Sequence, residues 1–190
     1  MNKLTVALND EQYKNIISTM LKGFSGFRPN EKVATALQIE ANIGMRISDV
    51  IKLTLNKIIR DGDRYRLNVI EQKTGKERVF TVPERIYQFI YIYCLKNEIK
   101  PNEPIFDITE RDVQKQLKRV VDYLGYENIG THSFRKYFAT KIYNNNNKDI
   151  LLVQELLQHA DAKTTQRYIT MSRVVVENAL EKNINLVDLI

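Results

Sequence analysis

The spacing of apolar residues changes twice along this chain, and that change limits the folds open to it. In one stretch Tyr65, Leu67 and Val69 alternate with the polar Arg66 and Asn68, a pattern typical of a β-strand. On either side of this stretch, apolar residues recur every three or four positions, as on one face of an amphipathic helix. The pattern predicts a mostly α protein with a small three-stranded antiparallel β-sheet, an α+β chain.

Two turns divide the alternating stretch, which covers about residues 55–82, into three strands. Asp61-Gly62 is a hairpin turn signal, because glycine readily adopts the positive φ that tight hairpins need. The run KTGK at residues 73–76 predicts a second turn before the last strand. We therefore expect a β insert within a single helical domain, since the chain shows no internal repeat and no long linker.

Capping and breaking residues bound the helical stretches. Asn9 or Asp10 is suited to cap the first helix, and Gly44 to end the second, since short polar side chains favour N-caps and glycine favours the position after a helix. The glycines and proline of FSGFRPN end the first helix. We expect the other helices over about residues 31–43, 48–53, 86–93, 113–124, 133–143, 149–158 and 162–169.

Composition excludes several classes of protein. Lys and Arg number 29 against 23 Asp and Glu, a net charge of +6, which makes a polyanionic partner plausible. The single cysteine, Cys94, excludes an internal disulfide and a cysteine-based zinc cage. No run approaches the roughly 20 apolar residues of a membrane span, and the N-terminus lacks the apolar core of a secretory signal. We expect a soluble protein of a reducing compartment.

His132 and Arg135 stand three residues apart, on one face of the first turn of an expected helix. Free backbone N–H groups and the helix dipole favour an anion at such a place. The two side chains are therefore suited to grip a phosphate. An isolated H-x-x-R pattern more often marks an ordinary helix start with a partly exposed histidine.

Arg46 follows Gly44 at the corner between two expected helices. There a guanidinium can turn inward and offer two parallel donors to a phosphate. Asp49, three residues further on, is placed to hold that guanidinium. The alternative is an exposed Arg–Asp ion pair that contributes less than about 1 kcal/mol.

Two further places carry reactive side chains. Lys73 in the second turn can deliver a proton donor to a site built elsewhere, with Lys76 and Arg78 beside it, although exposed turns commonly carry lysine for solubility. His159 ends an apolar helix, and Tyr168 follows nine positions later. A phenol with a pKa of about 10 becomes a nucleophile near neutral pH only when cations stabilise its anion, and this chain supplies several.

In their order and spacing, these elements resemble the catalytic domain of the tyrosine recombinase (phage integrase) family. IGMRISDV resembles the family's T-G-L-R-I-S-E-L box, and KTGKERVFTVP resembles its hairpin. HSFRKYFAT is similar to its H-x-L-R-H-T-F-A-T box, and LLQHADAKTTQRYIT to its L-G-H-x-x-x-x-T-T-x-x-Y box. The resemblance covers about residues 4–180. It implies a catalytic domain over residues 1–173 and a C-terminal amphipathic tail over 174–190.

The resemblance implies a site-specific, metal-independent DNA recombinase, an integrase with a phosphotyrosine intermediate. Its catalytic residues would be Arg46, Lys73, His132, Arg135, His159 and Tyr168. Tyr168 would attack a scissile DNA phosphate, giving a 3′-phosphotyrosine and a free 5′-hydroxyl. Arg46 and Arg135 would clamp the non-bridging oxygens and stabilise charge in the transition state.

The other members of the set handle protons and position the phosphate. The resemblance implies that His132 assists as acid or base towards the nucleophile and that His159 donates a hydrogen bond to the phosphate. Lys73 would protonate the leaving 5′-oxygen, with Lys76 in the same turn as the alternative. Asp49 would order the Arg46 region.

Three positions depart from the family pattern. Phe134 replaces the usual leucine, a change of packing, and Lys136 replaces the frequent second histidine. Gln158 replaces the common glycine before His159 and puts the local turn in doubt. None of the six principal positions is lost.

The resemblance also implies partners. We expect double-stranded DNA as substrate, a homo-oligomer (a tetramer on paired sites, a monomer as an isolated domain), and no cofactor, metal, membrane or small-molecule substrate. The tail over 174–190 would dock on a neighbouring subunit or fold back on its own domain. We expect the usual N-terminal core-binding domain to be absent and the chain to be an excised fragment or a minimal recombinase. Weak, salt-sensitive DNA binding would follow.

A cytoplasmic protein encoded by a bacterium, a phage or another mobile element fits the 17 asparagines of the chain. Two alternatives remain open. A type IB topoisomerase shares the chemistry but relaxes supercoils, and a catalytically silent DNA-binding module would keep the surface without the reaction.

Overall fold

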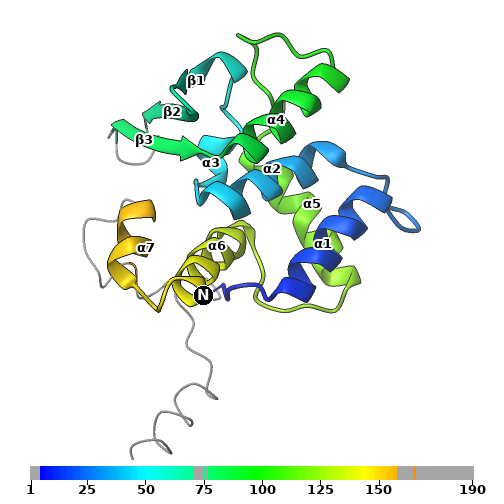
Figure 1. Ribbon diagram of the computed structural model, residues 1–190. Helices are drawn as coiled ribbons and strands as arrows, with labels where there is room; N and C mark the ends of the chain where they lie inside the picture. Colours follow the sequence, from blue (N-terminus) through cyan, green and yellow to red (C-terminus); the bar gives the residue numbers. More distant parts are fainter. Residues whose placement is uncertain (1–4, 71–74, 76, 158–164, 166–190) are drawn as a thin grey trace, which may run out of the picture.

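The computed structural model describes residues 5–70, 75, 77–157 and 165. A small sheet lies at one edge of a group of helices, next to α3 and α4 (Figure 1). The elements are α1 (Asp10–Lys22), α2 (Glu31–Ile43), α3 (Ile47–Val50), the 3-10 turn η1 (Leu55–Lys57), β1 (Ile58–Asp61), β2 (Arg64–Ile70), β3 (Glu77–Val82), α4 (Glu84–Lys96), α5 (Glu110–Tyr123), α6 (Thr131–Asn145) and α7 (Ile150–Leu157).

Helix α2 forms the centre of the protein. Nine of its residues are buried, and they lie on all sides of the helix. A helix that is buried all round must be covered all round, and α1, α3, α5 and α6 pack against it. Its bounds confirm the prediction, because Asn30 accepts the N–H of Val33 at the start and Gly44 is left-handed at the end, with φ +73°.

The expected β insert is also confirmed. The strands lie in the order β1-β2-β3, both pairs antiparallel. Ile58, Leu67 and Phe80 stand opposite one another across the three strands and are all buried, so one face of the sheet covers the helical core. Gly62, with φ +64°, makes the tight turn between β1 and β2.

The short third helix differs from its prediction. It covers Ile47–Val50 rather than residues 48–53. The backbone after it is engaged by a distant segment, since Ile105 donates its N–H to the Leu53 carbonyl at 2.8 Å and Thr54 forms a bridge with Pro104. Between these contacts and α3 the backbone tightens into i→i−3 hydrogen bonds, with Lys52 donating to Asp49 and Leu53 donating to Val50. The helix expected over 162–169 and the tail over 174–190 lie outside the described residues.

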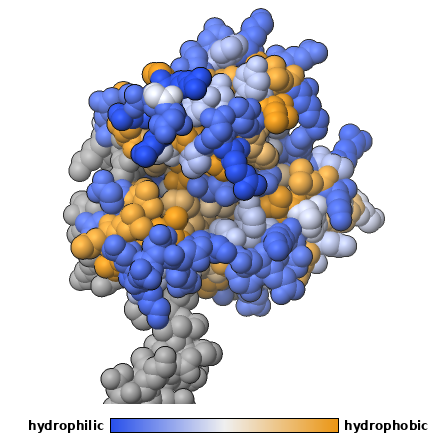
Figure 2. Space-filling view, viewed as in Figure 1, coloured by the Kyte–Doolittle hydropathy of each residue, from blue (hydrophilic) through white to orange (hydrophobic). Residues whose placement is uncertain are grey.

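Helices α6 and α7 build a second, smaller apolar cluster from Phe138, Ala139, Val153 and Leu157. Asp149 caps α7 by accepting the N–H groups of two residues in its first turn. The face seen in Figure 2 is mostly hydrophilic, with an apolar patch on the side where α7 lies. Of the helices in the described part of the chain, none is long and apolar enough to cross a membrane.

Gly44 combines two constraints at the end of α2. Its φ is +73°, and a Cβ added there would lie 2.5 Å from the ring of Phe138 on α6. Replacing Gly44 with alanine should lower the free energy of unfolding by about 2–4 kcal/mol, because left-handed strain and overpacking add. Gly125→Ala is the matched control, since its φ is +70° but nothing lies within 4 Å of its Cβ. Urea denaturation of both variants tests this, and equal losses would contradict the contact with Phe138.

Candidate active site

Arg135 lies in the second turn of α6, and its side chain is 1% exposed. Its Nη1 donates a hydrogen bond to the carbonyl of Gly44, and its Nη2 donates to the carbonyl of Leu157 at 3.1 Å. These carbonyls stand at the C-terminal ends of α2 and α7, where the helix dipoles place partial negative charge. Two helix ends therefore hold the buried guanidinium in one orientation.

Arg46 is positioned by the corner that follows α2. Gly44 turns the chain with its left-handed backbone, and α3 begins directly after Arg46, which is half-buried. The same glycine residue supplies the carbonyl that Arg135 binds. One backbone corner thus fixes both arginines that the sequence analysis assigns to the phosphate.

Asp49 lies on α3 and is 6% exposed. An exposed Arg–Asp pair was the alternative interpretation of this segment, and the burial of Asp49 is against it. Asp49 also lines a cavity of about 310 Å³ between α3 and the sheet, together with Leu53 and Val69. A buried carboxylate at this place can order the α3 region, as the sequence analysis expects.

His132 lies in the first turn of α6, and its side chain is exposed. Desolvation by surrounding protein atoms lowers the pKa of His132, and the charges of Arg135, Arg46 and Lys136 lower it further, whereas Glu110 opposes them. The lowered pKa favours the neutral imidazole near pH 7. A neutral imidazole can accept a proton from a nucleophile, which is the role of a general base.

We expect the imidazole of His132 to titrate with a midpoint below 6.5 in the free protein. Because its folded-state pKa is lowered, the folded state binds its proton less readily than the unfolded state, so this group costs stability as the pH falls below 6.5. Proton NMR can follow both histidines of the chain, with His132→Gln to assign the resonances. A midpoint above 6.5 would contradict the electrostatic environment described here.

Lys136 replaces a frequent family histidine and has a structural contact. Its Nζ donates a hydrogen bond to the backbone carbonyl of Thr5. Burial lowers the pKa of Lys136. This hydrogen bond links the N-terminal segment to α6. The lysine that stands in place of the frequent family histidine therefore has a structural role.

The structure brings part of the predicted set together. Arg46 directly precedes α3, while His132 and Arg135 lie on α6, and the charges of both arginines act on the imidazole of His132. Lys73, its alternative Lys76, His159 and Tyr168 lie outside the described residues, and so do Gln158 and the tail.

Sequence reasoning missed one ionisable residue of this region, Glu40. It lies in the last turn of α2 and is 1% exposed. The positive charge of Arg135 lowers the pKa of Glu40, against a larger rise caused by burial. A signal was present in the sequence, because Glu40 stands at helical spacing from Val33 and Leu37 on an apolar stripe. An acidic residue on such a stripe is a buried charge that needs a partner.

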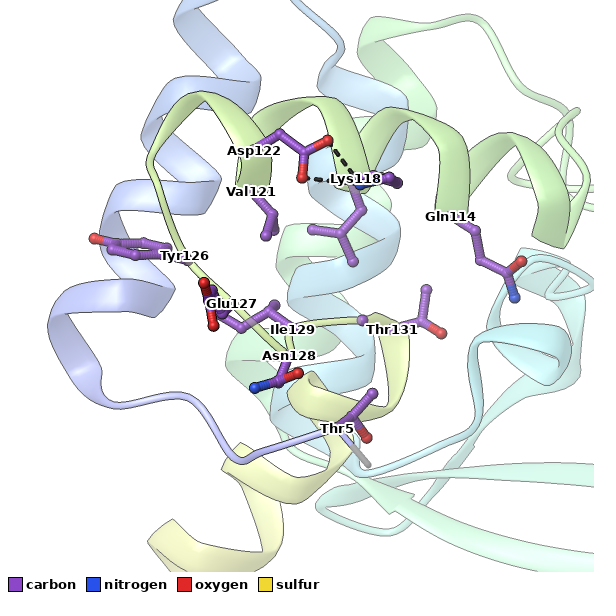
Figure 3. Close-up of a pocket in the computed structure, with 12 residues that line it drawn as sticks. Thr5, Gln114, Lys118, Val121, Asp122, Tyr126, Glu127, Asn128, Ile129 and Thr131 are labelled. Carbon is purple, nitrogen blue, oxygen red and sulfur yellow. Dashed lines mark hydrogen bonds and ion pairs between the residues drawn. The ribbon is translucent and has the colours of Figure 1, made fainter. Parts of the chain in front are cut away.

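A separate cavity of about 420 Å³ lies between α5 and the chain leading into α6 (Figure 3). Its lining includes Thr5 from the N-terminal segment, Asn128, and an ion pair between Lys118 and Asp122 at 2.8 Å. Arg46, His132 and Arg135, the predicted catalytic residues that the structure describes, do not line it. The lysine of this lining, Lys118, is already paired with Asp122, so the candidate active site is the Arg46–His132–Arg135 region.

Known proteins resemble this chain over most of its length. A model of the phage integrase family matches residues 7–173. The probable integrase/recombinase YoeC of Bacillus subtilis is 33% identical over 135 residues, which cover 67% of this chain and 71% of YoeC. The tyrosine recombinase XerH of Helicobacter pylori is 25% identical over 189 residues, covering 94% of this chain and 52% of XerH.

Solved structures show the same fold. XerH site-specific recombinase bound to palindromic difH substrate, in a post-cleavage complex, matches with a TM-score of 0.73 at 23% identity, over 95% of this chain and 53% of that one. The catalytic domain of bacteriophage HP1 integrase matches with a TM-score of 0.66 at 18% identity, over 94% and 95%. The chain thus spans about half the length of XerH and nearly all of the HP1 catalytic domain.

Proposed function

The chain belongs to the phage integrase family, and from this premise we propose that it is the catalytic part of a site-specific DNA recombinase. One observation carries the proposal. The guanidinium of Arg135 is held by two helix ends, beside Arg46 and a histidine whose pKa is lowered. An oriented guanidinium, with a second arginine and a neutral base near it, suits a phosphodiester that is attacked by a hydroxyl nucleophile.

The reaction follows from these groups together with the family motif. The Oη atom of Tyr168 attacks the scissile phosphorus, and its proton passes to His132. The bond between phosphorus and the 5′-oxygen breaks, and Lys73 protonates that oxygen. Arg46 and Arg135 stabilise the charge on the non-bridging oxygens, the kind of contact whose loss typically costs about 10²–10³ in rate. The reverse steps join the phosphate to a new 5′-hydroxyl, so the bond energy is conserved.

The remaining roles come from the motif alone. His159 donates a hydrogen bond to the phosphate, and Asp49 orders the segment that carries Arg46. The tail over residues 174–190 docks on a neighbouring subunit in a tetramer on paired sites. We place the catalytic domain at residues 1–173 and the protein in the cytoplasm.

Double-stranded DNA is the proposed substrate. The net charge of +6 favours a polyanion, and XerH, which shares this fold, was solved bound to its difH substrate. The named relatives are integrases and recombinases, which favours strand exchange over plain relaxation of supercoils.

A strand-transfer assay tests this function. The protein is incubated with nicked duplex DNA from its own locus, in which loss of a short 5′-hydroxyl fragment blocks religation. We expect an adduct that resists SDS and forms in the presence of EDTA. A new strand with a 5′-hydroxyl should then resolve the adduct into a joined product. DNA binding without any adduct would favour the silent module, and plasmid relaxation without joining would favour a topoisomerase.

A further inference from the structure

Glu40 is a buried carboxyl without a role in the proposed reaction. Among the described residues only Glu40 and Asp49 are buried acids, and Glu40 lies on a helix that is otherwise almost wholly apolar at its buried positions. Burying an ionisable group costs several kcal/mol unless its surroundings compensate it. An apolar residue of similar size would avoid that cost. The groups that surround the carboxyl of Glu40 are therefore the place to look for its role.

The surroundings of Glu40 connect it to both candidate arginines. Its carboxylate accepts a hydrogen bond from the backbone N–H of Ile47, the residue directly after Arg46. Its own backbone carbonyl accepts the N–H of Gly44 at 2.9 Å. Gly44 in turn accepts the hydrogen bond from Arg135.

The charge of Arg135 also acts on the carboxyl of Glu40. Burial raises the pKa of Glu40 well above its ordinary value, while the positive charge of Arg135 and the hydrogen bond from Ile47 oppose the rise. The Oε2 atom of Glu40 has no hydrogen-bond partner within the described part of the chain. Arg135 is therefore the main charged group that can balance this carboxyl.

We propose that Glu40 is a positioning residue that holds Arg46 and Arg135 in fixed relation to one another, and so sets the rate of attack on the phosphate. The inference rests on the proposed function. The carboxyl orients the start of α3 through Ile47 and attracts the guanidinium on α6, so one buried group links two elements that meet at the phosphate. Such support matters because displacement of a reacting group by about 1 Å can cost about 10²-fold in rate.

Two substitutions separate the parts of this role. Glu40→Gln keeps the volume and an acceptor for the Ile47 N–H but cannot ionise. Glu40→Met removes the acceptor as well. At saturating DNA we expect the rate of adduct formation to fall about 10-fold for glutamine and about 100-fold for methionine, with DNA affinity within about twofold of the wild type, since no phosphate contact is lost.

A second measurement reads the arginine directly and does not need activity. The side-chain N–H resonances of Arg135 can be followed by ¹⁵N NMR and assigned with Arg135→Lys. In the wild type they should be narrow and slow to exchange, and in Glu40→Met they should broaden. Thr35→Val is the matched control, because Thr35 is also buried on α2 and should change neither readout.

The outcomes are distinct. Unchanged rates in both Glu40 variants, or unchanged Arg135 resonances in Glu40→Met, overturn the positioning role. If Glu40→Met does not fold, the rate and Arg135 resonances of Glu40→Gln decide the question. Altered Arg135 resonances in a protein whose wild type forms no adduct would uphold the link between the residues while the proposed function fails.

Discussion

Replacing Arg135 with lysine should lower the rate of covalent adduct formation at saturating DNA by at least about 100-fold. Lysine keeps the positive charge, so DNA affinity should change little. It has no planar fork, however, and cannot donate to the carbonyls of Gly44 and Leu157 while it faces a phosphate. The loss should therefore appear in the chemical step, measured by single-turnover cleavage of nicked DNA.

Arg135→Ala adds a loss of stability. It removes both hydrogen bonds from the guanidinium to the carbonyls of Gly44 and Leu157, and it leaves a cavity between α2, α6 and α7. Leaving buried hydrogen-bond acceptors without their donor typically costs about 1–3 kcal/mol each, and urea denaturation measures the total loss. Arg111→Ala is the control, since Arg111 is exposed on α5. An Arg135→Ala variant with wild-type stability and wild-type cleavage would show that the buried guanidinium contributes neither to folding nor to the chemical step.

Replacing Tyr168 with phenylalanine should abolish the adduct altogether while DNA binding remains. The substitution removes one oxygen, the atom that would form the bond to phosphorus, and leaves the ring and its packing. Tyr143→Phe is a matched control from the α6–α7 region, where Tyr143 is a partly buried packing residue. Gel shift and SDS-resistant adduct assays on the same DNA separate binding from chemistry. Residual adduct in Tyr168→Phe would mean that another residue is the nucleophile.

Local signals predicted the elements that they control. The end of α2 follows from Gly44, and the β insert follows from alternation and the turn at Gly62, because capping and turn preferences act over a few residues. The early end of α3 did not follow from such signals. There the backbone tightens into i→i−3 hydrogen bonds and then pairs with Ile105, which is 52 positions from its hydrogen-bond partner Leu53.

In the candidate site, too, local motifs predicted some features, whereas features that depend on distant residues were not predicted. The motifs predicted Arg46, His132 and Arg135, and the fold brings these three together. The motifs did not predict that Arg135 would be buried and held by the ends of two helices, because those carbonyls belong to residues distant in sequence. Glu40 was missed for a related reason. Its importance comes from α2 packing against α6, and only its place on an apolar stripe hinted at burial.

The central claim, that this chain cleaves DNA through Tyr168, is tested most directly by mapping the covalent adduct. Wild-type protein trapped on nicked DNA is digested with protease and nuclease, and the modified peptide is sequenced by mass spectrometry. We predict a single phosphodeoxynucleotide-bearing peptide, modified at Tyr168. A modification at any other residue, or its persistence in Tyr168→Phe, would contradict the assignment.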